Sequence, residues 1–164
     1  MANEFEHMRL DRQLCFLLYA SSREMTKLYK PLLDELNLTY PQYLALLLLW
    51  EHGELSVKTM GKLLYLDSGT LTPMLKRMEQ HGLLTRERSP EDERSVIVRL
   101  TAGGQALQEK ASSIPQHMIA QTDLSAGELK NLKQTLESLL ASLTKKQMSC
   151  KDSKRRLQCE GASL

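Results

Sequence analysis

The chain has 164 residues, of which 41% are hydrophobic and 26% charged, as is typical of one globular domain with a packed core. No apolar run reaches the roughly 18 residues of a membrane span, and the charged N-terminus has no signal-peptide pattern, so we expect a cytoplasmic protein with no membrane partner. The three cysteines, Cys15, Cys150 and Cys159, are odd in number and far apart. This argues against a disulfide framework, and without clustered Cys/His spacing we expect no bound metal or cofactor.

The net charge of +2 is unevenly distributed. Residues 145–164 hold six basic and two acidic side chains, which leaves 16 basic and 18 acidic residues in the rest of the chain. Residues 63–100 carry six of each sign. A broad basic face for nucleic acid is therefore excluded, and any DNA binding must depend on a few placed cations. The candidates are Arg77, Arg86, Arg88 and Arg94.

The first third of the chain predicts two helices that differ in exposure. Residues 10–36 repeat apolar side chains at helical spacing, in a stripe too broad for one small core to cover. Part of this face should therefore contact a second subunit, and Pro31 should kink or break the helix. The next helix begins near Thr39, is apolar on nearly every side and ends near Gly53, so we expect it to be buried.

The middle of the chain predicts a short helix, a second helix and a hairpin. The short helix is capped by Ser56, and the second begins at Asp67 or Ser68. The apolar back of the second helix has the spacing i, i+3, i+4, i+7 and consists of Leu71, Met74, Leu75 and Met78. Residues 84–88 and 95–100 then read as two strands around a polar tip that contains a proline.

This order of elements is typical of a winged helix-turn-helix, whose second helix lies in the DNA major groove while the hairpin reaches the backbone or minor groove. An amphipathic helix and a surface hairpin in any α+β domain give the same pattern, so both interpretations stay open on pattern alone. Pro73 lies past the first turn of the second helix, where we expect strain or a bend.

The C-terminal part predicts two more helices and a tail. Residues 105–121 have a helical apolar pattern that Pro115 interrupts. Ser125 and Glu128 form a capping box for a last helix, whose leucines share one face to about residue 144. Terminal helices of this kind commonly pair across a two-fold axis. Residues 145–164 lose the pattern and are predicted to be a disordered basic tail.

The predicted fold class is therefore mainly α with a small β-wing. One winged helix-turn-helix domain should occupy residues 1–144, with its DNA-reading part at about 40–101. Dimerisation helices at about 9–36 and 105–144 should flank that part.

Three stretches carry a resemblance to a known family. The helix DSGTLTPMLKRMEQHGL at 67–83 and the wing RSPEDERSVIVRLT at 88–101 resemble those of MarR-family winged-helix repressors. The segment QLCFLLYASSREMTKLYKPLLDELNLTYPQYLALLLLWE at 13–51, which contains Cys15, is similar to the organic-hydroperoxide-sensing OhrR branch of that family. The resemblance runs from about residue 10 to residue 144.

The resemblance implies a homodimer that binds a pseudo-palindromic double-stranded DNA operator and represses a peroxide-detoxification gene. By position it implies that Ser68, Thr70 and Arg77 contact the major groove. It also implies that Arg94 enters the minor groove, braced by Asp92. Residues two apart on a strand point the same way, so we expect an ion pair between these two side chains.

The same resemblance implies that Cys15 is the sensor and that its oxidation by an organic hydroperoxide releases DNA. It also implies that Tyr29 and Tyr40 of the other subunit hydrogen-bond near the sulfur of Cys15, with Tyr19 close by. From the residues alone, one cysteine in an apolar helix is more often an inert core residue. Reactivity needs hydrogen-bond donors or positive potential beside a thiolate. Four of the five tyrosines lie within residues 19–43, as such donors or as core aromatics.

Residues 102–144 contain no second cysteine, so the resemblance favours the type in which a small thiol forms a mixed disulfide with oxidised Cys15. Cys150 and Cys159 are either redox partners or incidental tail residues. Three rivals remain: a MarR-type repressor released by a small aromatic ligand, a thiol peroxidase that uses Cys15, and a helical dimerisation module with no DNA role. No resolving pair or general base stands at a useful spacing for a peroxidase, so we expect no enzyme activity.

Overall fold

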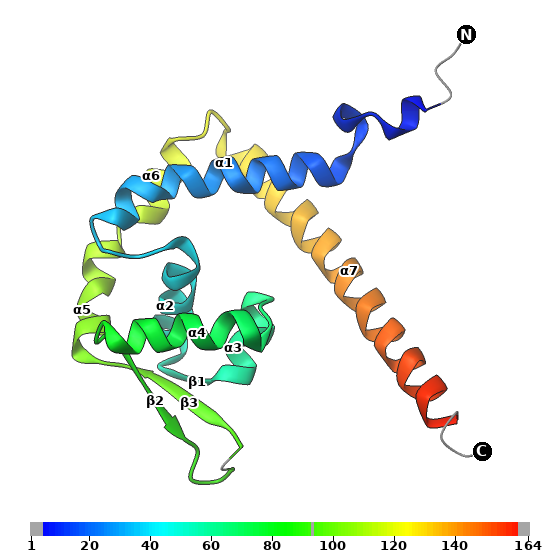
Figure 1. Cartoon of the computed structure of the whole chain (residues 1–164). Coiled ribbons are helices and arrows are strands. Elements are labelled where there is room, and N and C mark those ends of the chain that lie inside the picture. Colours follow the sequence, from blue (N-terminus) through cyan, green and yellow to red (C-terminus); the bar gives the residue numbers. More distant parts are fainter. Residues whose placement is uncertain (1–4, 93, 161–164) are drawn as a thin grey trace. The chain divides into compact units, whose positions relative to one another are not determined.

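The computed structural model describes residues 5–92 and 94–160, with side chains up to residue 145 (Figure 1). The chain forms two compact units, Met1–Gln121 and Thr122–Leu164, which are described separately. The first contains, in order, the 3-10 turns η1 (Glu6–Met8) and η2 (Leu10–Arg12), helices α1 (Leu14–Asp34) and α2 (Tyr40–His52), strand β1 (Glu54–Ser56), helices α3 (Val57–Leu64) and α4 (Ser68–Gln80), strands β2 (Leu84–Arg88) and β3 (Val96–Leu100), and helices α5 (Ala102–Ala111) and α6 (Ile114–Ala120). The second contains α7 (Ala126–Glu160). The predicted class, mainly α with a small β-wing, is confirmed.

The predicted hairpin is part of a three-stranded antiparallel sheet of order β1-β3-β2. Val98 of β3 lies opposite Arg86 of β2 and Leu55 of β1, which fixes the register of both pairings. The β2–β3 hairpin projects away from the helices as a wing (Figure 1). Strand β1 was not predicted, because its three residues are too few to show an alternating pattern.

Helix α2 forms the centre of the core, as its nearly continuous apolar surface predicted. Its side chains pack against the apolar back of α4. The fully buried residues at this contact include Leu46, Leu49, Leu71, Leu75 and Met78. Burial of each such side chain is worth about 1.5–3 kcal/mol relative to exposure, so this contact fixes α4 firmly on the core.

The N-terminal part of α4 combines an aspartate cap with an internal proline. Asp67 is the N-cap, as predicted, and its Oδ1 accepts the N–H of Thr70 at 2.9 Å. Pro73 lies inside α4, and the helix continues past it. The ring removes the N–H that would have bonded the carbonyl of Gly69, and both residues lie on the exposed side of the helix. The cost of the proline therefore falls on the solvent side of α4.

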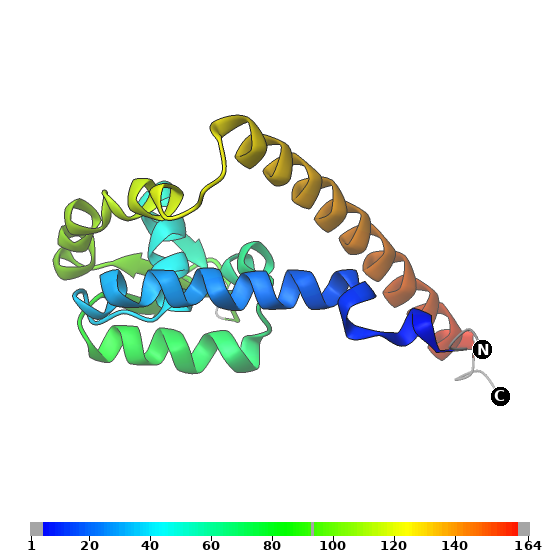
Figure 2. The same cartoon turned by 90° about the horizontal axis from the view of Figure 1, so that it is seen from above.

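Helix α1 begins at Leu14, later than its apolar pattern predicted. The side chain of Gln13 donates to the carbonyls of His7 at 2.8 Å and Arg9 at 3.1 Å, which folds the preceding segment into 3-10 turns. Pro31 does not break α1, which continues to Asp34. The N-terminal half of α1, together with η1 and η2, extends beyond the other elements of its unit in both views (Figure 2).

Helix α5 begins at Ala102, three residues before the predicted start at residue 105. The Oγ1 of Thr101 accepts the N–H of Gly104 at 3.1 Å and so caps the helix. A Cβ at Gly104 would overlap the carbonyl oxygen of Leu83, so glycine permits the close approach of α5 to the start of β2. Trp50 Nε1 donates to the carbonyl of Gly104 at 3.1 Å, which ties the end of α2 to the same point.

In the second unit, the predicted capping box of α7 is confirmed. Ser125 N–H donates to Glu128 Oε2 at 2.8 Å, and Glu128 N–H donates to Ser125 Oγ at 3.3 Å. The backbone is helical to Glu160, beyond residue 145, where the sequence predicted a disordered tail. Residues 145–160 contain no glycine or proline, so helix propensity outlasts the apolar stripe. The side chains of residues 146–164 lie outside the described part.

Candidate nucleic-acid interface and redox site

The exposed side of α4 holds two of the residues that the sequence predicted to contact DNA. Thr70 and Arg77 are seven residues apart, about two turns, and so share one exposed flank. The Thr70 hydroxyl donates to Asp67 Oδ2 at 2.9 Å, which leaves its methyl group and oxygen lone pairs for a partner. The Thr70 backbone N–H is the main reason that the pKa of Asp67 lies below its ordinary value. The cap therefore stays charged at neutral pH.

A groove of about 690 Å³ lies between α3, α4 and the wing. Ser68 from α4 lines it together with Asp92 and Arg94 from the wing, so the fold brings three of the predicted DNA residues to one place. Thr70 and Arg77 lie on the other flank of α4 and do not line this groove. The predicted DNA contacts are thus spread over the whole outer side of α4, with the wing residues beside only one of its flanks.

Two lysines of α3 line the same groove and were missed by the sequence reasoning. Lys58 and Lys62 are one helical turn apart and exposed. Both lysines lie outside residues 63–100, over which the charges of the predicted DNA-binding stretch were counted. Their spacing of four residues on the polar side of a short amphipathic helix was the available signal.

The tip of the wing is closed by local hydrogen bonds. Ser89 N–H donates to the Ser95 carbonyl and Ser95 N–H to the Asp92 carbonyl, each at 2.8 Å. Asp92 Oδ1 accepts the backbone N–H of Arg94 at 3.0 Å. Within the described residues no ion pair joins the Asp92 and Arg94 side chains, so that expectation is wrong. Both residues precede β3 and lie in a turn, where an aspartate caps the N–H two residues ahead.

An ion pair joins α4 to the wing. Arg86 donates to the Glu79 carboxylate from Nη2 at 2.7 Å, from Nε at 3.0 Å and from its backbone N–H at 2.9 Å. The hydrogen bonds from Arg86 hold the pKa of Glu79 below its ordinary value. Arg86 was a candidate DNA cation from the charge count, but its charge is already paired within the fold.

The predicted sensor thiol lies on the surface of its protomer. Cys15 is the second residue of α1 and is exposed, and its neighbours Leu14 and Leu17 are 61% and 55% exposed. The interpretation of an inert core cysteine is therefore wrong for a single protomer. The thiol also lies in the first turn of a helix, at the positive end of the helix dipole.

The predicted supporting tyrosines gather elsewhere, where the C-terminal half of α1 meets α2. The ring centroids of Tyr29 and Tyr40 are 4.7 Å apart, and those of Tyr29 and Tyr43 are 6.0 Å apart. Burial raises the pKa of all three hydroxyls, so they are protonated at neutral pH and each has a proton to donate. Tyr19 is exposed and stacks with the Arg23 guanidinium, 5.6 Å from the ring centroid.

Cys15 and Tyr29 cannot meet within one chain. They are 14 residues apart on the continuous helix α1, which is about 21 Å at 1.5 Å per residue. Tyr40 packs against Tyr29, with the two rings tilted by 49°. One protomer thus contains the sensor and its predicted donors at two separate places.

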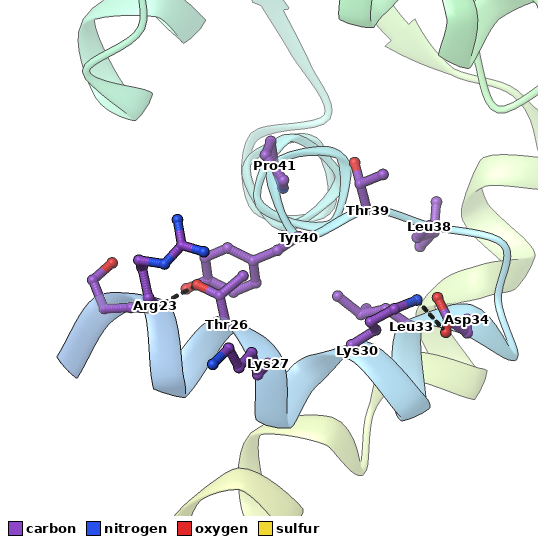
Figure 3. Close-up of a pocket in the computed structure, with 11 residues that line it drawn as sticks. Arg23, Thr26, Lys27, Lys30, Leu33, Asp34, Leu38, Thr39, Tyr40 and Pro41 are labelled. Atoms are coloured by element: carbon purple, nitrogen blue, oxygen red, sulfur yellow. Dashed lines mark hydrogen bonds and ion pairs between the residues drawn. The ribbon is translucent and has the colours of Figure 1, made fainter. Parts of the chain in front are cut away.

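A cavity of about 500 Å³ lies between α1 and the start of α2 (Figure 3). The Tyr40 ring points from α2 toward α1, beside Arg23 (Figure 3). Lys27 and Lys30 also line the cavity, and each is paired with a carboxylate of α1 at 2.6 Å. Arg23 has no carboxylate partner in the described part of the chain. The cavity therefore combines an aromatic wall with excess positive charge.

The helix-turn-helix, the wing and the groove between them define the class of the protein, a winged-helix transcriptional regulator. Within residues 5–92 and 94–145, no group of three or more His, Cys, Asp or Glu side chains could hold a metal ion. None of the described helices is both long and apolar enough to cross a membrane.

Comparison with known proteins gives the family. The model described as transcriptional regulator SarA/Rot matches residues 27–114. The organic hydroperoxide resistance transcriptional regulator of Bacillus subtilis is 66% identical over 146 residues, which are 89% of this chain and 99% of that protein. The chain belongs to the MarR family of winged-helix regulators, in its organic-hydroperoxide branch.

Solved structures of the family agree with this assignment. Reduced AbfR bound to DNA has a TM-score of 0.73 and 39% identity, over 87% of this chain and 97% of that one. AbfR has also been solved on DNA in an overoxidised form. A cysteine mutant of MarR from Escherichia coli complexed with operator DNA has a TM-score of 0.74 and 26% identity, over 85% of this chain and 99% of that one.

Proposed function

We propose that this protein is a DNA-binding transcriptional repressor that senses organic hydroperoxides by oxidation of Cys15 and then releases its operator. The observation that carries the proposal is an exposed thiol on the first turn of α1 in a winged-helix regulator. The Bacillus subtilis relative, named for organic hydroperoxide resistance, and the reduced and overoxidised forms of AbfR on DNA support it. A regulator acts by binding, and we assign no enzymatic turnover to Cys15.

DNA binding is assigned to the outer side of α4 and the wing. Helix α4 has 13 residues, about 20 Å, and fits a major groove about 12 Å wide. Lys58 and Lys62 are placed to contact phosphates, which adds charge to a surface that is otherwise balanced. The proposed reading residues are Ser68, Thr70 and Arg77 in the major groove, and Arg94 in the minor groove with its backbone held by Asp92.

A pseudo-palindromic operator requires two copies of α4, and α1 offers the surface for a homodimer. The helix exposes apolar side chains along its length that its own core does not cover, with Leu14 at 61%, Leu17 at 55% and Leu28 at 41%. Burying this stripe against a second copy removes it from water. A dimer also offers the arrangement in which Cys15 of one protomer meets the tyrosine cluster of its partner.

The proposed chemistry is a two-electron oxidation of the Cys15 thiolate. The sulfur attacks the outer oxygen of the hydroperoxide, the O–O bond breaks, and Cys15 becomes a sulfenic acid. The inner oxygen leaves as an alkoxide and takes a proton to become an alcohol. The protonated hydroxyls of Tyr29 and Tyr40 are suited to hydrogen-bond the sulfur or the leaving oxygen.

A small thiol is proposed to complete the switch. It condenses with the sulfenic acid, so that a disulfide forms and water leaves. The side chains of Cys150 and Cys159 lie outside the described residues. Mass spectrometry of the peroxide-treated protein should find the small thiol on Cys15, whereas a disulfide between Cys15 and either tail cysteine would overturn this step.

A gel shift on an operator fragment, selected from a random duplex library, tests the whole proposal. Wild type and Cys15→Ser should both bind, and an organic hydroperoxide should release wild type only. Release of both variants would contradict the thiol assignment. Binding by neither would contradict the repressor function and favour a dimerisation module.

The cavity between α1 and α2 favours a second candidate, a repressor released by a small aromatic ligand. It has the volume of a small-molecule site, an aromatic wall from Tyr40 and an unpaired cation from Arg23. In this case an aromatic carboxylate such as benzoate releases DNA from Cys15→Ser as well as from wild type. Release that depends on Cys15 and on peroxide removes this candidate.

A further inference from the structure

We propose that Glu79 and Arg86 are positioning residues, which hold the wing at the angle at which Arg94 reaches DNA while α4 occupies the major groove. This inference rests on the proposed DNA-binding function. Neither residue is assigned a contact with a base, because the charge of each is neutralised by the other. The pair acts through the geometry of α4 and the wing.

The location of Glu79 indicates a tertiary role. It lies in the last turn of α4, where the negative end of the helix dipole disfavours a carboxylate. Gly82, at φ 70°, donates to the Glu79 carbonyl at 2.9 Å, and Leu83 donates to Met78 at 3.0 Å, which ends the helix in a Schellman motif. A carboxylate at this place is stable because Arg86 supplies the compensating charge.

The contacts between the two side chains leave little freedom. Both carboxylate oxygens of Glu79 are used, one by the backbone N–H of Arg86 and the other by its guanidinium. The Arg86 side chain is only 19% exposed and that of Glu79 35%. The pair is therefore more shielded than an ordinary surface ion pair, and its two-point geometry fixes an orientation as well as a distance.

No other ion pair within the described residues joins α4 to the wing. Arg99 bonds Glu54 and Glu87, but these contacts run between strands of the same sheet. Arg86 itself lies at the root of the wing, opposite the buried Val98. The Glu79–Arg86 pair is thus the polar contact that sets the angle between the two DNA-reading elements.

The wing acts as a lever about this root. From Arg86 to the tip at Pro90 the chain advances four residues, which is at most about 13 Å. A rotation of about 10° at the root therefore moves the tip by about 2 Å, which exceeds the roughly 0.5 Å range of a normal hydrogen-bond length. The hydrogen bonds at the tip make it move as a unit, so Arg94 shifts with it.

A double-mutant cycle tests the proposal, with operator affinity measured by fluorescence anisotropy on full-length protein. Glu79→Gln keeps the side-chain volume and removes the charge. We expect about tenfold weaker binding in the wild-type background and less than a twofold effect in the Arg94→Ala background, because the wing contact is then already lost. Removing a negative charge near DNA by itself strengthens binding, so the expected sign is opposite to that of simple electrostatics.

Glu87→Gln is the matched control, since it removes the same charge from the wing and leaves the contact with α4 intact. It should leave affinity unchanged or raise it. Equal effects of Glu79→Gln in both backgrounds, or stronger binding, would overturn the inference. If Glu79→Gln lowers the unfolding midpoint, the same cycle is repeated with Arg86→Lys, which keeps the charge. The result of that second cycle then decides whether the pair positions the wing. Absence of operator binding by wild type, or no effect of Arg94→Ala, would count against the proposed function instead.

Discussion

Mixed dimers test whether the proposed sensor is assembled from two protomers. One protomer carries Cys15→Ser, and the other carries Tyr29→Phe together with Tyr40→Phe. The remaining thiol then belongs to the protomer without the two hydroxyls and faces the protomer that keeps them. A site built across the subunit interface regains one complete copy, whereas a site within one chain regains none.

The length of α1 gives the size of the expected effect. Cys15 and Tyr29 are separated by about 21 Å along the helix, and a hydrogen bond requires about 3 Å between its atoms, so intrachain contact is excluded. Hydrogen bonds to a charged group contribute about 1.5–3 kcal/mol. Loss of the hydroxyls should therefore slow oxidation of Cys15 by about 10- to 150-fold.

The assay is the rate of sulfenic-acid trapping by dimedone, followed by mass spectrometry on dimers purified through two different tags. The thiol of the mixed dimer should react at the wild-type rate, and the homodimer that lacks both hydroxyls should react slowly. Tyr65→Phe, at an exposed tyrosine of the α3–α4 turn, is the matched control and should change nothing. A mixed dimer as slow as that homodimer refutes the two-subunit site.

Four further predictions concern the wing, the exposed apolar stripe of α1, the α2–α5 contact and the α4–wing ion pair. Arg94→Ala should weaken operator binding about 5- to 150-fold in anisotropy titrations, with an unchanged unfolding midpoint. Leu17→Arg should convert the dimer to a monomer in sedimentation, because a charge enters the exposed apolar stripe. Trp50→Phe should lower the free energy of unfolding in urea by about 1 kcal/mol, since one hydrogen bond is lost. The pKa of Glu79 is lowered, so its carboxylate stabilises the fold fully above its ordinary pKa, and this stabilisation is lost as the pH falls through the lowered pKa. Glu79→Gln should therefore flatten the acidic part of a plot of unfolding free energy against pH.

Most of the fold was predictable because its signals are local. The caps at Ser56, Asp67 and Ser125 and the apolar periodicities act within a few residues, and the structure has each of those helix starts. Strand β1 depends on pairing with β3, which no local pattern reveals. The start of α5 was missed for a similar reason. Gly104 is required because the Leu83 carbonyl approaches it closely, and nothing in the local sequence distinguishes it from a glycine in a linker.

The site was harder to predict, because exposure and pairing belong to the tertiary structure. Cys15 lies among leucines that resemble a core, yet these leucines are exposed in the protomer. Arg86 counted as a free cation until the fold placed Glu79 beside it. The turn at Asp92 replaced an expected side-chain ion pair with a backbone contact. Residue types and the family resemblance named the candidate residues, and packing decided which charges remain available.

The same packing joins the tyrosine cluster to the end of α4. Tyr29 lies 6.0 Å from Tyr43, and Tyr43 lies 6.4 Å from Trp50, measured between ring centroids. Trp50 bonds the carbonyl of Gly104, and Gly104 lies against the carbonyl of Leu83. Leu83 is three residues past the end of α4, and its N–H donates to the Met78 carbonyl in the last turn of that helix. Tyr43 is buried in the close-packed core, so a displacement of its ring shifts the groups that it contacts.

That route ends at the turn that holds Glu79, the residue whose bond with Arg86 sets the angle of the wing. In the proposed mechanism, oxidation of Cys15 at a subunit interface need not alter any charge on the proposed DNA-reading face. A small rotation at the end of α4 is enough to weaken DNA binding, because over the length of the wing it displaces the tip by about 2 Å. A reading surface with balanced charge suits this kind of control. It depends on a few placed contacts, so the loss of one or two removes a large share of the affinity, whereas a broad basic face would retain DNA through the same rotation.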